Sequence, residues 1–116
     1  LYKELKTIMF KTEGVQGSLK DLVRRYEGIT LAFLYGSYAK NRERKTSDID
    51  LVVVGEFPRD PFTRDVRKVE SKLNREINFT AYAISEFSKE REKKGGFLNL
   101  VLKDNIIVLK GTPGVE

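Results

Sequence analysis

Two short and almost wholly apolar segments, with a charged stretch between them, constrain the fold of this chain most. Residues 29–35 and 48–54 are each too short for a typical core helix, but they suit strands buried on both faces. Every residue from Lys40 to Lys45 is charged or Asn, which is typical of a solvated loop. We therefore predict two buried strands that are joined by an exposed connection.

Helical periodicity in the flanking segments completes a mixed pattern of helices and strands. It predicts helices up to about residue 10, from a capping box at Ser18 towards Gly28, from an N-cap at Asp60 to residue 74, and from Ser85 through residue 94, with helix resuming over 97–102. Further strands are expected at 76–84 and 106–109. The predicted fold is a mixed α/β (α+β) sheet of about four to five strands flanked by helices, whose strand order the pattern does not determine.

The length of 116 residues fits a single domain, 1–116, with N-terminal helices in 1–27, a core in 28–110 and a tail in 111–116. The first residue is Leu1 rather than Met, so we expect this domain to be part of a longer chain. No apolar run approaches the roughly 18 residues of a membrane-spanning helix, and there is no secretion signal. We expect a cytoplasmic protein that does not bind membranes.

The absence of Cys and His excludes several kinds of chemistry. A disulfide, a thiol nucleophile, an imidazole base and a Cys/His zinc site are all impossible, so a metal site must use oxygen ligands, which favours Mg²⁺ or Mn²⁺. The net charge of +5 permits anionic partners but identifies none.

The start of the second strand carries two carboxylates, Asp48 and Asp50. Side chains alternate along a strand, so both should project from one face, about 6.6 Å apart along the chain, where they can converge on one or two divalent cations. The alternative is a solvent-facing strand start with two acids. At the end of the first strand, Gly36 allows close backbone approach and Ser37 offers a hydroxyl to a phosphate, although a capped turn would have the same sequence.

The stretch from Phe33 to Val54 resembles the signature of the DNA polymerase beta nucleotidyltransferase superfamily, in particular its minimal single-domain members. That signature is an apolar strand, Gly-Ser, a short helix, a variable loop, then Ser-Asp-x-Asp and further apolar residues. The stretch from Arg75 to Phe87 and the charged segment after it look like a subgroup often fused to a winged-helix DNA-binding domain. The resemblance implies a mixed sheet flanked by helices.

The resemblance also implies functional residues. Asp48 and Asp50 would be catalytic and bind Mg²⁺ (or Mn²⁺), which holds a nucleoside triphosphate (NTP) substrate. The third metal ligand is normally a carboxylate, but the matching position here is Asn78, whose amide carries no charge; Glu76, on the same strand face, is a possible substitute or merely a strand-edge acid. The residues implied in nucleotide binding are Gly36, Ser37, Lys40, Arg42, Arg44 and Ser47, although the basic ones also suit a solvated loop.

Two functions follow from this resemblance. The first is a Mg²⁺-dependent nucleotidyltransferase that moves a nucleoside monophosphate onto a hydroxyl of a protein or small molecule. The alternative is a catalytically weak or inactive nucleotide-binding sensor domain of a transcription regulator or antitoxin-like protein. Prokaryotic relatives often pair with a HEPN-type helical protein, which is therefore an expected partner. A basic nucleic-acid-binding domain is a third reading, but no recognisable RNA- or DNA-binding motif supports it.

Overall fold

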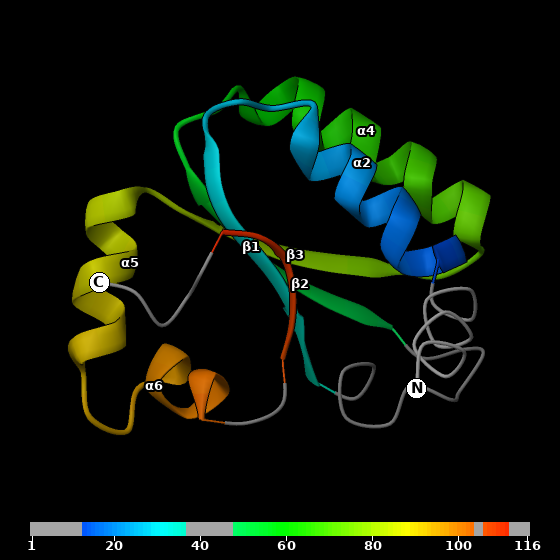
Figure 1. The fold of residues 1–116 in the computed structure, drawn as a ribbon. Coiled ribbons are helices and arrows are strands. Elements are labelled where there is room, and N and C mark those ends of the chain that lie inside the picture. Colours follow the sequence, from blue (N-terminus) through cyan, green and yellow to red (C-terminus); the bar gives the residue numbers. More distant parts are fainter. Residues whose placement is uncertain (1–12, 37–47, 104–105, 112–116) are drawn as a thin grey trace, which may run out of the picture.

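A four-stranded mixed sheet lies at the centre of the structure, a computed structural model that describes residues 13–36, 48–103 and 106–111 (Figure 1). The spatial order of the strands is β3-β2-β1-β4. Strand β1 pairs antiparallel with both β2 and β4, whereas β2 and β3 are parallel. The strands are β1 (Ile29–Tyr35), β2 (Ile49–Gly55), β3 (Ile77–Tyr82) and β4 (Ile107–Lys110).

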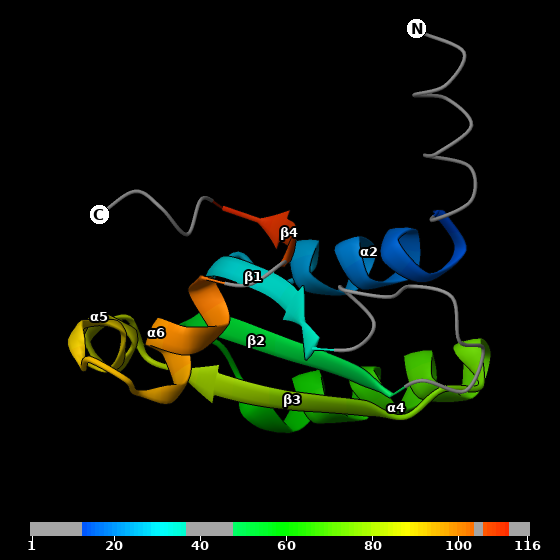
Figure 2. The same cartoon turned by 90° about the horizontal axis from the view of Figure 1, so that it is seen from below.

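Helices lie on both sides of this sheet (Figure 2). On one face are α2 (Ser18–Arg24), which continues from the π-helical turn η1 (Glu13–Gly17), and α4 (Arg59–Leu73), which connects the parallel strands β2 and β3. Helices α5 (Ile84–Glu92) and α6 (Phe97–Leu102) supply the opposite side of the structure. The sheet is therefore the middle layer, as the sequence pattern predicted.

Each face of the sheet has its own hydrophobic cluster, which explains why the central strands are almost wholly apolar. In β2, Ile49, Leu51 and Val53 belong to the cluster under α2 and α4, whereas Val52 and Val54 belong to the other. We call the second the α6-side cluster; its buried members are Leu31, Phe33, Val52, Val54, Phe87 and Leu98. Alternation along a strand doubly covered by helices produces this pattern.

The predicted elements are confirmed within the described residues, but their starts differ. Ser18 does not cap a helix, because the chain is already helical from Glu13, and α2 ends at Arg24 rather than near Gly28. Helix α4 begins one residue before Asp60, after Pro58, without a side-chain cap.

The charged segment after β3 begins its helix earlier than predicted. Helix α5 starts at Ile84 and not after Ser85, since Glu86 Oε1 accepts a hydrogen bond from the Ala83 N–H at 2.8 Å. This early start also ends β3 at Tyr82 instead of Ile84. The helix predicted before residue 10 and the loop at residues 40–45 lie outside the described residues.

Candidate active site

Asp50 occupies the centre of a row of three residues that crosses the sheet. Its Cα partners are Tyr35 in the antiparallel strand β1 and Asn78 in the parallel strand β3. Because side chains alternate, the Asp50 carboxylate lies on the face opposite α2 and α4, where it is half-buried. The strands therefore bring Asp50 and Asn78 together at neighbouring positions.

Gly36 lies directly beside the Asp50 carboxylate. Its φ of 79° lies in the left-handed region that favours glycine, and a Cβ at this position would overlap Asp50 Oδ2. The end of β1 therefore presents bare backbone directly beside the carboxylate. The backbone conformation therefore favours glycine at this position, and any Cβ would force the Asp50 side chain to move.

The electrostatic surroundings of Asp50 raise its pKa above the ordinary value. Burial is the largest cause and the charge of the nearby Asp48 adds to it, whereas a side-chain hydrogen bond with Asn78 lowers the pKa. Asp48 itself is exposed and lies immediately before β2. The structure thus places two carboxylates close enough to repel each other, with one amide that partly offsets the repulsion.

These donors fit a hard divalent cation, since two carboxylates and an amide oxygen are the ligand types that Mg²⁺ and Mn²⁺ accept. In the described part of the chain, no group of three or more Asp, Glu, His or Cys side chains could hold a metal ion. Glu76 therefore does not complete a carboxylate triad with Asp48 and Asp50. The available set is Asp48, Asp50 and the Asn78 amide.

Five predicted nucleotide-binding residues lie outside the described residues. They are Ser37, Lys40, Arg42, Arg44 and Ser47. Their assignment remains a prediction.

Tyr35 is a neighbour of the site that sequence reasoning missed. Burial raises the pKa of Tyr35, as do the charges of Asp50 and Tyr82, while a side-chain hydrogen bond with Thr80 acts in the opposite direction. The available signal was its position directly before Gly36, at the end of a predicted strand. Without the pairing register, that signal did not identify which residue faces the carboxylate.

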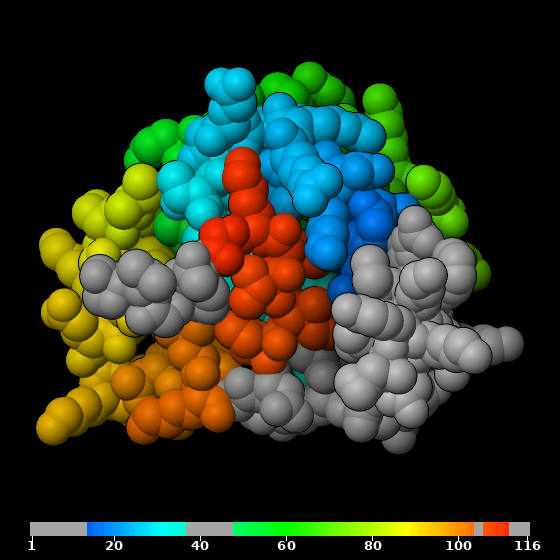
Figure 3. All heavy atoms as spheres, viewed as in Figure 1, coloured from blue at the N-terminus to red at the C-terminus, as the bar shows by residue number. Residues whose placement is uncertain are grey.

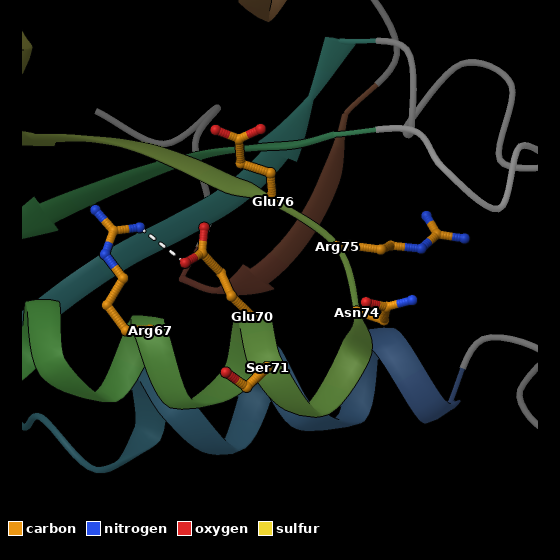
Figure 4. Close-up of a pocket in the computed structure, with 6 residues that line it drawn as sticks. All are labelled: Arg67, Glu70, Ser71, Asn74, Arg75 and Glu76. Atoms are coloured by element: carbon orange, nitrogen blue, oxygen red, sulfur yellow. Dashed lines mark hydrogen bonds and ion pairs between the residues drawn. The ribbon is translucent and has the colours of Figure 1, made fainter.

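A polar hollow of about 620 Å³ lies where α4 ends and β3 begins (Figure 4). Glu70 fixes this junction, because its Oε2 accepts a hydrogen bond from Ile77 N–H at 2.7 Å and its Oε1 accepts one from Arg67 at 2.9 Å. The carboxylate of Glu76 points away from Glu70, to the other side of the β3 backbone. The hollow includes neither Asp48 nor Asp50, so it is distinct from the candidate site.

A family model and several solved structures relate this chain to known proteins. The family model described as polymerase beta, nucleotidyltransferase, matches residues 17–111. Among curated proteins, none matches the sequence. Several solved structures match the fold of this chain at low sequence identity. These matches support a similarity of fold alone.

Three of the similar structures are toxin-antitoxin complexes. One, the toxin-antitoxin with AMP-PNP, has 19% identity and a TM-score of 0.58, with 85% of this chain and 75% of that chain covered. A mutant of the toxin-antitoxin MntA-HpeT has 17% identity and a TM-score of 0.56, with coverage of 84% and 74%. The tri-AMPylated Shewanella oneidensis HEPN toxin in complex with MNT antitoxin has 18% identity and a TM-score of 0.51, with 84% of this chain and 70% of that chain covered.

The family model and the observed mixed sheet agree with each other. None of the helices within the described ranges has the length and apolar character of a membrane span. A fused winged-helix domain stays a prediction. Because the family model covers most of its length and the mixed sheet has the expected architecture, this chain belongs to the polymerase beta nucleotidyltransferase family.

Proposed function

We propose that this domain is a Mg²⁺-dependent nucleotidyltransferase that transfers a nucleoside monophosphate from an NTP to a hydroxyl of a protein or small molecule. The observation that carries the proposal is the convergence at Asp50. Its carboxylate lies against the bare backbone of Gly36, with Asp48 and Asn78 as neighbours. Such a site offers oxygen ligands for a cation and an approach for phosphate in the same place.

Asp48, Asp50 and the Asn78 amide would hold the cation. When bound, Mg²⁺ would neutralise charge on the phosphates and stabilise the charge that develops during transfer. Gly36 leaves room for phosphate oxygens, and Ser37, Ser47 and the basic residues Lys40, Arg42 and Arg44 are assigned to binding the remaining phosphates. The acceptor oxygen forms a bond to the α-phosphorus, the bond to the bridging oxygen breaks, pyrophosphate leaves, and the hydroxyl proton is released to water.

A protein acceptor is the preferred form of this proposal. One structure of similar fold contains a tri-AMPylated HEPN toxin with an MNT antitoxin, and another contains AMP-PNP. We therefore propose a cytoplasmic antitoxin-like role, with a HEPN-type protein as both partner and acceptor. A fused DNA-binding domain would instead connect nucleotide binding to transcription.

The neutral Asn78 supports a second candidate, a nucleotide sensor with little turnover. An amide contributes an oxygen ligand without charge, so the cation would be held less tightly than by three carboxylates. The two candidates share the site and differ only in the chemical step.

Radiolabelled NTPs, Mg²⁺ or Mn²⁺, and a cell extract or purified HEPN-type protein provide the test. We expect label transfer and pyrophosphate release by the wild type, and loss of both in Asp50→Asn. Asp21→Asn is the matched control, because Asp21 is an exposed acid on α2, which covers the opposite face of the sheet from the Asp50 carboxylate. Mg²⁺-dependent NTP binding without transfer would support the sensor, and no binding would contradict both candidates.

A further inference from the structure

Phe97 is an aromatic side chain that the core does not use. It is the first residue of α6 and 44% exposed, whereas the adjacent Leu98 is fully buried in the α6-side cluster. Figure 3 shows α6 at the molecular surface beside β4. Burial therefore explains Leu98 but not the position of the Phe97 ring.

The Phe97 ring is nevertheless held in a defined orientation. Its centroid lies 5.4 Å from that of Tyr35, with the planes at 78°, an edge-to-face contact. Tyr35 is itself fixed, since it packs against the α6-side cluster and forms a side-chain hydrogen bond with Thr80. The exposed Phe97 ring therefore has a packed neighbour that orients it without a ligand.

Tyr35 also connects this ring to the candidate site. It is the Cα partner of Asp50 and the residue directly before Gly36. Only two neighbour contacts, from Asp50 to Tyr35 and from Tyr35 to Phe97, separate the carboxylate from an exposed aromatic face. The carboxylate and the aromatic surface thus lie on the same side of the sheet.

The backbone before α6 places Phe97 at this point. Gly95 has a φ of 74°, which favours glycine, and Gly96 is the N-cap residue, whose carbonyl accepts the Leu100 N–H at 3.0 Å. The chain therefore turns sharply and starts the helix with Phe97. This turn fixes which residue of α6 lies beside Tyr35.

We propose that Phe97, supported by Tyr35, is the stacking surface for the base of the nucleoside triphosphate whose phosphates bind at Asp50 and Gly36. The inference rests on the proposed function and adds to it a binding residue for the base. A nucleotide has one highly charged end and one flat aromatic end, and this side of the sheet offers a partner for each. Stacking accepts any base, because every base has a π face.

Equilibrium binding of two probes tests the inference. The first probe is ATP with Mg²⁺, and the second is inorganic tripolyphosphate with Mg²⁺, which has the phosphates but no base. Removal of one stacking side chain weakens binding by roughly 5- to 150-fold in other systems. We expect Phe97→Ala to weaken ATP binding within that range while tripolyphosphate binding changes less than about two-fold.

Three further variants separate stacking from general damage. Phe97→Tyr keeps a ring and should retain ATP affinity, whereas Phe97→Leu keeps an apolar side chain and should not. Leu100→Ala is the matched control, because Leu100 is on the same helix and 58% exposed, and it should leave both affinities unchanged. Circular dichroism and thermal melting check that each variant folds.

The outcomes distinguish failure of this inference from failure of the proposed function. Unchanged ATP affinity in Phe97→Ala, or equal weakening of ATP and tripolyphosphate, would overturn the stacking role and leave the nucleotidyltransferase proposal standing. A wild-type protein that binds neither probe would overturn both. If Phe97→Ala does not fold, equal ATP affinities of Phe97→Leu and Phe97→Tyr would reject stacking.

Discussion

At the scale of single residues, the contact between Gly36 and Asp50 determines the site, and it yields a test with an internal control. Gly36→Ala must adopt a left-handed conformation and also displace Asp50 Oδ2, whereas Gly95→Ala has a similar φ but open space around the new Cβ. The strain alone costs roughly 1–2 kcal/mol. We expect Gly36→Ala to lower the free energy of unfolding by about 1 kcal/mol more than Gly95→Ala does, as measured by urea denaturation. Equal losses would show that Asp50 moves aside freely.

A second residue-scale prediction concerns Asn78. In Asn78→Asp a third carboxylate joins Asp50 and Asp48, so like-charge repulsion should destabilise the metal-free protein while Mg²⁺ binds more tightly, by about ten-fold or more. Thermal melting with and without Mg²⁺ measures both effects. Asn99→Asp adds the same charge on α6 and should show no gain in Mg²⁺ binding. Unchanged Mg²⁺ affinity in Asn78→Asp would contradict its assignment as the third ligand position.

At the scale of elements, Glu70 joins the end of α4 to the start of β3. Burial tends to raise the pKa of Glu70, but the hydrogen bond from Ile77 N–H and the bond and charge of Arg67 outweigh it, so the pKa lies below the ordinary 4.5. The ionised Glu70 carboxylate therefore stabilises the fold fully above about pH 4.5, and this contribution is lost as the pH falls through the lower folded-state pKa of Glu70. We expect Glu70→Gln to cost about 1–2 kcal/mol at pH 7, with the difference from wild type shrinking in acid.

The control for this prediction is Glu90→Gln. Glu90 pairs with Lys93 at 3.0 Å in an exposed position, and such pairs contribute about 0.5 kcal/mol or less. Urea denaturation at pH 7 and pH 3 measures both variants. A pH-independent difference between Glu70→Gln and wild type would contradict the assigned role of the carboxylate.

The elements also show which parts of the fold could be predicted from the sequence. The two central strands were predictable because polar or flexible residues bound their apolar runs: Gly36 follows β1, and Asp48 and Asp50 stand at the start of β2. The same residues also identified the candidate site. Helix starts were less accurate, because Ser18 and Ser85 have capping side chains but the backbone had already entered a helix before each of them. Strand order and the contact between Tyr35 and Phe97 depend on packing between distant segments, which no local pattern encodes.

At the scale of the whole molecule, an aromatic cluster connects segments far apart in the chain. The fully buried Phe62 of α4 makes edge-to-face contacts with Tyr26, Phe57 and Phe79 at centroid distances of 5.0–5.3 Å. We expect Phe62→Ala to cost roughly 3–5 kcal/mol, because it leaves a cavity where these segments meet. Phe62→Leu should cost clearly less. Chemical denaturation measures both, and a loss below about 1 kcal/mol in Phe62→Ala would contradict this role.

The pairing of Tyr35 with Asp50 has a consequence for how proteins of this design diversify. The strands themselves fix both ends of the connection between residues 36 and 48, so the sheet does not depend on the composition of that connection for its register. Substitutions between residues 37 and 47 should therefore leave the pairing of β1 with β2 unchanged. A change of sequence in that short stretch can therefore alter the predicted phosphate contacts at little cost to the arrangement of the strands.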